Sequence, residues 1–209
     1  MKSKQRHDGG AYRRMKTMVS MYAKPAKNRA ATKKRRKQIF EDAVKQACEH
    51  YKQTGRADID KTPEPFRVLK KLPDGLFTGR FTALAQPDFQ GTLLGGRSII
   101  FETKYTAGDR IERRALTQKQ MDILKSHDEL GAIALVVFGI QDKFYAMSWA
   151  QWDNMKLIFN HQYVEPSQIE YFRVKFNGAV LFMDRMNGIR LDGDIHGWID
   201  QLKRLVKWK

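Results

Sequence analysis

The chain has 209 residues, of which 42% are hydrophobic and 11% aromatic, and this is enough for one domain with its own core. Lys and Arg outnumber Asp and Glu by 39 to 23, and the resulting net charge of +16 indicates a polyanionic partner such as nucleic acid. One cysteine, Cys48, cannot form an internal disulfide framework, and the longest apolar run, 131–140, is too short to span a bilayer. No apolar stretch follows the basic N-terminus, so we expect a cytoplasmic protein without a signal peptide and away from membranes.

Most of the positive charge lies at the N-terminus. Residues 1–37 hold fourteen Lys or Arg and one acid, Asp8, so this segment carries +13 and the rest of the chain +3. Because it has few large apolar residues, we predict a disordered basic tail over 1–37 and a folded domain over 38–209. The last cations of the tail are expected to bind phosphates, with a solubilising arm as the alternative. These cations are Lys33, Lys34, Arg35 and Arg36.

Hydrophobic periodicity and turn residues predict the elements of the folded part. In chain order we expect a helix over about 33–54, a short strand over 57–59, a protruding hairpin or loop pair over 67–86, strands over 88–93 and 98–105, a helix over 117–129, strands over 132–140 and 143–148, a short helix over 149–155, weaker strands over 170–176 and 180–183, and a final amphipathic helix over 195–206. This order of helices and strands predicts an α/β protein with a mixed sheet.

The residues most suggestive of chemistry are Asp88 and, fourteen positions later, Glu102-Thr103-Lys104. Side chains alternate along a strand, so Glu102 and Lys104 are expected on one face and Thr103 on the other. Asp88, on the preceding strand, can lie beside them, and burying these charges next to an apolar strand would be costly without a purpose. Carboxylate oxygens suit Mg²⁺, which can polarise a phosphodiester and lower the pKa of a bound water. Lys104 can stabilise charge that develops on the phosphate.

The same pattern also occurs by chance on solvated strands, where Glu and Lys form a surface ion pair of little value. Its context here favours a site, because the pattern ends an apolar strand after a Gly-Gly turn in a strongly basic protein. Five scattered histidines show no ligand or triad spacing and are not expected to be catalytic.

Several longer motifs accompany this pattern between Phe40 and Trp152. They are Phe40-Glu41, the segment 57–65 (ADIDKTPEP), Asp88-Phe89-Gln90-Gly91, Gly96-Arg97, Phe101-Glu102-Thr103-Lys104, Leu116-Thr117-Gln118-Lys119-Gln120-Met121, and Gly131-Ala132-Ile133-Ala134. Together they resemble the RecU-type Holliday junction resolvases of the PD-(D/E)xK superfamily. That resemblance implies a restriction-endonuclease-like mixed sheet flanked by helices, with a projecting stalk at about 67–86. The last fifty residues do not resemble the family well.

The resemblance also implies roles for single residues. Asp88 and Glu102 would bind Mg²⁺, for which Mn²⁺ can substitute, Lys104 would stabilise the transition state, and Gln120 would complete the metal site. The family usually has Thr two positions before the Asp, where this chain has Gln86, whose amide oxygen could serve instead. The middle residue of the motif is commonly Ala, and we expect Thr103 to be neutral because it faces away. Glu41 is either an accessory acid or a helix-surface carboxylate.

The family's stalk enters the open centre of a four-way junction, so four stalk cations are expected to contact phosphates: Arg67, Lys70, Lys71 and Arg80. Phe77 and Phe81 would pack at the stalk base or against unstacked bases. For each single residue a solvated loop remains the simpler interpretation.

The expected function is therefore that of a Mg²⁺-dependent, structure-selective endonuclease that resolves four-way DNA junctions as a homodimer, with recombination proteins as further partners. The alternatives are a nuclease of the same chemistry with another DNA substrate, and a non-catalytic nucleic-acid-binding protein. Intact Asp88, Glu102 and Lys104 argue against a pure binding protein, because clustered acids near phosphate do not help binding.

Overall fold

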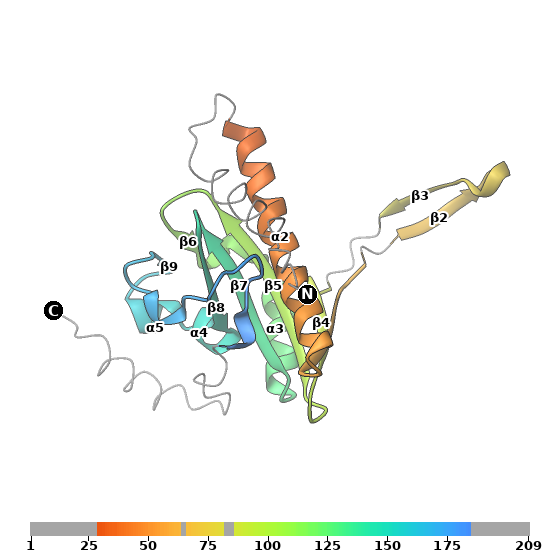
Figure 1. Cartoon of the computed structure of the whole chain (residues 1–209). Coiled ribbons are helices and arrows are strands. Elements are labelled where there is room, and N and C mark those ends of the chain that lie inside the picture. The colour runs from red at the N-terminus through yellow and green to blue at the C-terminus, as the bar shows by residue number, and fades with distance from the viewer. Residues whose placement is uncertain (1–28, 64–65, 82–85, 185–209) are drawn as a thin grey trace, which may run out of the picture.

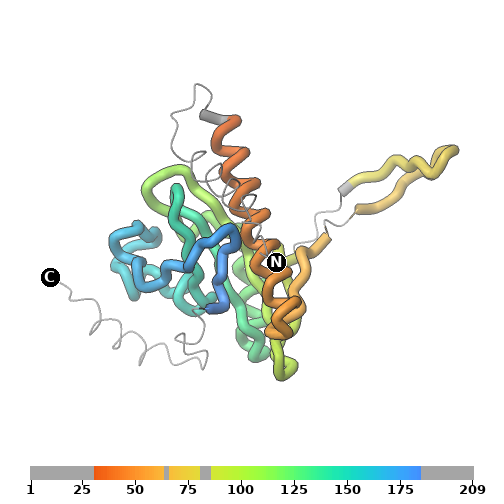
Figure 2. Tube along the Cα trace, in the orientation of Figure 1, coloured from red at the N-terminus to blue at the C-terminus, as the bar shows by residue number. Residues whose placement is uncertain are grey.

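The structure is a computed structural model that describes residues 29–63, 66–81 and 86–184, and the following account concerns these residues. Five strands form a mixed sheet with helices on both faces, and a two-stranded hairpin stands away from the body (Figures 1 and 2). The predicted α/β class, the mixed sheet and the projecting hairpin are confirmed. None of the described helices is long and apolar enough to cross a membrane.

The main sheet has the order β1-β4-β5-β7-β8. Its strands are β1 (Ala57–Lys61), β4 (Phe89–Leu93), β5 (Ser98–Thr106), β7 (Ile133–Ile140) and β8 (Lys143–Ser148). β5 and β7 run parallel, and the other neighbours are antiparallel. All of β7 is buried, as its continuous apolar run predicted. The central strand β5 carries Glu102 and Lys104, which pair with Val136 and Phe138 of β7, whereas the β4 ladder reaches only to Phe101.

Helices cover the two faces of the sheet differently. The long helix α2 (Arg29–Gln53) packs one face, where its apolar stripe meets Phe89 and Phe101, whose rings stack at 4.7 Å between centroids. The other face is covered by α3 (Gln118–Glu129), α4 (Trp149–Asp153) and α5 (Met155–Phe159). Because neighbouring residues of a strand face opposite sides, Phe101 belongs to the α2 core while Ile100 belongs to the α3 core.

The hairpin consists of β2 (Phe66–Lys71) and β3 (Phe77–Phe81), joined by the 3₁₀ turn η1 (Pro73–Gly75). Asp74 has a φ of 62° inside this turn, a left-handed conformation that Asp adopts more readily than most residues. All six residues of β2 are exposed, so the hairpin buries almost nothing against the body. The prediction of a protruding hairpin around Pro73-Asp74-Gly75 is confirmed.

Helix α2 begins earlier than expected, at Arg29 rather than near 33. Residues 29–37 are therefore helical, in contrast to the disordered tail predicted up to residue 37. Arg, Lys and Ala are good helix formers, and the apolar face that starts at Phe40 anchors the helix to the sheet. The rest of the predicted tail, residues 1–28, and the predicted final helix, 195–206, lie outside the described residues.

The strands predicted over 170–176 and 180–183 are wrong. The chain forms the 3₁₀ turn η3 (Glu170–Phe172) and then irregular backbone with two isolated bridges, one from Tyr145 to Arg173 and one from Phe176 to Val180. Val174, Val180 and Phe182 are nonetheless buried, so the pattern that suggested strands reflects burial alone. A further small sheet pairs β6 (Ile111–Glu112) with β9 (Tyr163–Val164), and η2 (Arg113–Ala115) lies between β6 and α3.

Candidate metal centre and nucleic-acid interface

Asp88 and Glu102 lie opposite each other where β4 begins. Phe89 pairs with Phe101, and the antiparallel register places the preceding Asp88 across from Glu102. The backbone N–H of Thr62, just beyond the end of β1, donates to the carbonyl of Asp88 at 2.9 Å. Three neighbouring strands thus bring the first predicted carboxylate next to the second, at the edge from which the hairpin connection leaves the sheet.

The Asp88 carboxylate is held by Thr103. Its Oδ2 accepts a hydrogen bond from the Thr103 backbone N–H at 2.8 Å and another from the Thr103 hydroxyl at 2.7 Å. We expected Thr103 to be neutral because it faces away from the site, yet its hydroxyl contacts Asp88. The Thr103 side chain does leave β5 on the face opposite Glu102. Because β4 begins only at Phe89, opposite Phe101, no β4 residue pairs with Thr103, and its hydroxyl can reach Asp88 past this unpaired edge of β5.

Gln120 connects Glu102, Lys104 and the start of α3. Its amide Nε2 donates to Glu102 Oε2 at 2.5 Å, and its Oε1 accepts from Lys104 Nζ at 3.0 Å. The same Oε1 accepts from the backbone N–H of Thr117, the N-cap residue of α3, at 3.1 Å. Gln120 thus forms one half of a capping box and also contacts the site. In this arrangement it presents its nitrogen, rather than its oxygen, to Glu102.

Glu102 is the most deeply buried ionisable side chain of this group, with 1% of its surface exposed. Burial and the nearby charge of Asp88 raise the pKa of Glu102 to about 8, against the opposing effect of Lys104. Lys104 Nζ lies 3.8 Å from Glu102 Oε2, too far for a strong hydrogen bond. One amine at this distance leaves two close carboxylates poorly compensated, and a bound cation would compensate them.

The donor set fits Mg²⁺. The two carboxylates are hard oxygen ligands, and Mg²⁺ typically takes one or two carboxylates and completes its shell with water. The described residues contain no group of three or more His, Cys, Asp or Glu that could hold a metal ion.

The structure does not bring Gln86 or Glu41 into contact with these side chains. Gln86 is exposed, and among the described residues its side chain forms no hydrogen bond to Asp88 or Glu102. Glu41 is paired instead with two lysines, Lys37 at 3.4 Å and Lys61 at 3.5 Å.

The hairpin has a basic face and an apolar face. Arg67 pairs with Arg80, and beyond a bulge Lys70 pairs with Thr78, which places these residues on one face. The other face carries the aromatic and aliphatic side chains together with Lys71: Phe66, Val68 and Phe77. Two arginines directly opposite each other repel, so this row does not stabilise the hairpin and is suited to a bound anion.

The basic N-terminal turns of α2 form a second cationic surface. Lys33, Lys34 and Arg35 are exposed, whereas Arg36 is half-buried and its guanidinium interacts with Tyr105 on β5. The helix therefore presents three of the four predicted phosphate-binding cations to solvent.

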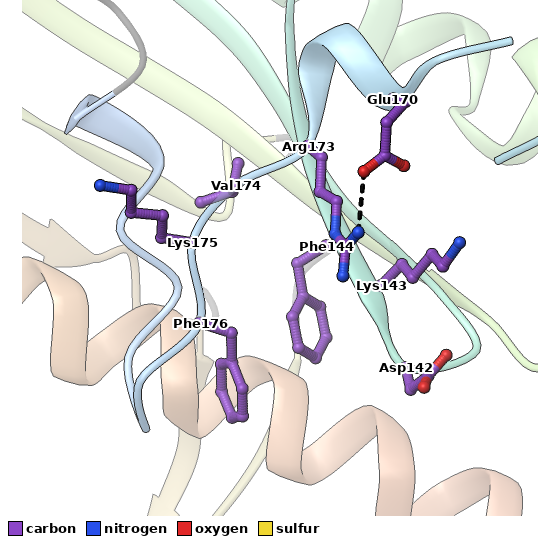
Figure 3. Close-up of a pocket in the computed structure, with 8 residues that line it drawn as sticks. All are labelled: Asp142, Lys143, Phe144, Glu170, Arg173, Val174, Lys175 and Phe176. Atoms are coloured by element: carbon purple, nitrogen blue, oxygen red, sulfur yellow. Dashed lines mark hydrogen bonds and ion pairs between the residues drawn. The ribbon is translucent and has the colours of Figure 1, made fainter. Parts of the chain in front are cut away.

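A further pocket of about 450 Å³ lies at the opposite edge of the main sheet, beside β8 (Figure 3). Phe144 and Phe176 lie on one side of it, and the ion pair between Arg173 and Glu170, 2.7 Å long, lies on the other. It contains none of the predicted site residues.

Sequence reasoning missed two residues of the site, Thr103 and Thr117. Thr117 was detectable, because Thr followed three positions later by Gln is a capping-box signal that places Gln120 at the third helical position. No sequence pattern predicts the hydrogen bond from Thr103 to Asp88, because this bond depends on the residue at which β4 begins.

Comparisons with known proteins agree with the motifs. The family model described as RecU, Recombination protein U, matches residues 35–189, so the likeness extends further toward the C-terminus than the motifs predicted. No curated protein matches. Among solved structures, a match is found to Hjc of Archaeoglobus fulgidus, a Holliday junction resolvase from an archaeal hyperthermophile. It has 12% sequence identity and a TM-score of 0.35, and it covers 54% of this chain and 76% of that one.

Proposed function

Because this chain belongs to the RecU family of Holliday junction resolvases, we propose that it cuts four-way DNA junctions in a Mg²⁺-dependent reaction at Asp88, Glu102 and Lys104. The observation that carries the proposal is the meeting of two carboxylates and an amine on one side of β5, at the edge where the hairpin connection leaves the sheet. A protein that only binds DNA would gain nothing from the buried Glu102 carboxylate there.

In this proposal Asp88 and Glu102 hold Mg²⁺, or Mn²⁺ in its place, through carboxylate oxygens. When bound, the ion would polarise a phosphodiester and lower the pKa of a water. Hydrolysis would join a water oxygen to phosphorus and break the bond from phosphorus to the 3′ oxygen, which would leave with a proton. The products are a 5′-phosphate and a 3′-hydroxyl.

Lys104 and Gln120 have distinct parts. The Lys104 ammonium donates to phosphate oxygens as negative charge develops on them. Gln120 holds both Glu102 and Lys104 through the two ends of its amide, which supports a positioning role. If Gln120 also ligates the metal, its Oε1 must first release Lys104 and the N–H of Thr117.

Recognition is assigned to the hairpin and to α2. The basic face of the hairpin would contact phosphates near the junction centre, and the exposed Phe77 could stack on unpaired bases. Lys33, Lys34 and Arg35 would contact the backbone of an arm. Two symmetric cuts need two sites, so the active species would be a homodimer acting in the cytoplasm, where recombination proteins supply junctions.

The test compares a mobile four-way junction, a linear duplex and a flap of the same sequence, each with Mg²⁺, with Mn²⁺ and with EDTA. We expect cleavage of the junction with either ion and none in EDTA. Cleavage of all three DNAs at similar rates would support a general nuclease instead. Binding without cleavage under every condition would support a non-catalytic protein.

A further inference from the structure

The two hydrogen bonds from Thr103 to Asp88 were not expected from the motif of Asp88 and Glu102-Thr103-Lys104. Asp88 lies just before β4 and so outside the paired residues of that strand. Both donors of Thr103 end on the same oxygen, Oδ2, at 2.7 and 2.8 Å. Thr103 itself is 8% exposed and belongs to the central strand, so the anchor is rigid.

Two donors on one carboxylate oxygen restrict both side-chain torsions of Asp88. Hydrogen bonds to an ionised carboxylate are shorter and stronger than neutral ones. The backbone N–H is present whatever the residue at position 103, whereas the hydroxyl is specific to Thr or Ser. Neither of these two bonds engages the other carboxylate oxygen, Oδ1.

We propose that Thr103 is a positioning residue, whose hydroxyl orients the Asp88 carboxylate for binding a divalent cation. The inference rests on the proposed function, in which Asp88 is a metal ligand. It goes beyond that function, because the middle position of the motif was expected to be neutral. If the hydroxyl served only packing, replacing it by a methyl group of the same shape would leave cation affinity unchanged.

The test uses Thr103→Val, which keeps the shape of the side chain, and Thr103→Ser, which keeps the hydroxyl. Thr92→Val, at an exposed position of β4, is the matched control. Mn²⁺ binding to the full chain is measured without DNA by calorimetry, and the melting temperature is measured in EDTA. The Mg²⁺ concentration that gives half-maximal junction cleavage is measured separately.

We expect Thr103→Val to weaken Mn²⁺ binding about tenfold, the lower end of what a hydrogen bond to a charged group contributes, because the backbone donor remains. The Mg²⁺ requirement should rise similarly, while the rate at saturating Mg²⁺ changes little. Thr103→Ser should stay within about twofold of the wild type, and Thr92→Val should not differ from it.

Wild-type affinity in a folded Thr103→Val would overturn the inference, and so would loss of affinity in a folded Thr103→Ser. If Thr103→Val does not fold, Thr103→Ala takes its place and the same comparison with Ser decides. A wild type that binds no Mn²⁺ would instead overturn the metal assignment of the proposed function, which separates the two failures.

Discussion

The hairpin and the site are neighbours in the chain, yet they differ in almost every physical respect. Asp88 and Glu102 are held by hydrogen bonds from two elements, and Glu102 is buried in the centre of the sheet. In the hairpin, Leu76 is 64% and Phe77 56% exposed, and no main-sheet strand covers either face. The site is therefore packed into the core of the domain, whereas the hairpin contributes almost nothing to that core.

This difference separates two kinds of constraint. We expect substitutions at the site to affect both cleavage and folding, because its side chains are buried and charged. We expect substitutions in the hairpin to affect binding alone, since little of the core depends on it. Each of the following experiments tests this difference between the two regions.

The largest effect is expected from Glu102→Gln. Loss of this carboxylate should reduce junction cleavage by about a thousandfold or more, while junction affinity changes less than about twofold, because one acid near phosphate does not aid binding. Cleavage is followed on labelled junctions and affinity by anisotropy at one fixed salt concentration. Asp88→Asn and Lys104→Ala should behave alike. Near wild-type cleavage by Glu102→Gln would contradict the assignment.

Thiol alkylation compares the two regions directly. Burial, followed by the nearby charge of Asp60, raises the pKa of the Cys48 thiol in the core to about 12. Thr78→Cys would place a second thiol on the exposed hairpin. At pH 8 the hairpin thiol should react about a thousandfold faster or more, because the thiolate is the reactive form and Cys48 is also shielded. Mass spectrometry of timed samples measures both rates, and equal rates would show that the α2 core opens readily.

The basic face of the hairpin should decide between substrates. Replacing Arg67, Lys70 and Arg80 together by Ala should weaken junction binding about tenfold or more and duplex binding much less, because only a branched substrate has an opening for the hairpin. The control removes the same charge elsewhere, at Lys125, Lys156 and Lys175.

Both triple variants are titrated against junction and duplex at one salt concentration, and their melting temperatures are compared. Equal losses on the two DNAs would show that the hairpin is an ordinary basic surface. A large drop in melting temperature for the hairpin variant would contradict its independence from the core.

The smallest expected effect is on stability. In EDTA at pH 8, Glu102→Gln should raise the melting temperature by about 2–4 °C, which corresponds to about 1 kcal/mol for a chain of this size. The reason is that an amide can still accept from Gln120 but does not repel Asp88. Calorimetry measures the change, and a lower melting temperature would mean that the Lys104 ion pair outweighs the burial cost.

Much of the fold could be predicted because several segments carry strong local signals. The Pro73-Asp74-Gly75 turn marked the hairpin, and the continuous apolar run marked β7. The pairing of Asp88 with Glu102 followed from the short Gly-Gly turn, which fixes an antiparallel register.

Other features depend on tertiary context. Val174, Val180 and Phe182 are buried although their backbone is irregular, so periodicity indicated burial there and was mistaken for strand. The start of α2 was placed too late because a basic segment without apolar residues resembles a tail until the fold anchors its end. The contact of Thr103 with Asp88 depends on β4 beginning at Phe89, one residue after Asp88, and no local pattern reveals this.

The capping box of α3 has a consequence for heat sensitivity. Gln120 Oε1 accepts from the N–H of Thr117, and the same side chain holds Glu102 and Lys104. We therefore expect fraying of the first helical turn to release Glu102 and Lys104 together. Helix ends open at lower free energy than whole domains, so we expect activity to fail below the global melting temperature. As the temperature rises, the rate of amide hydrogen exchange in the first turn of α3 should increase over the same range in which activity is lost.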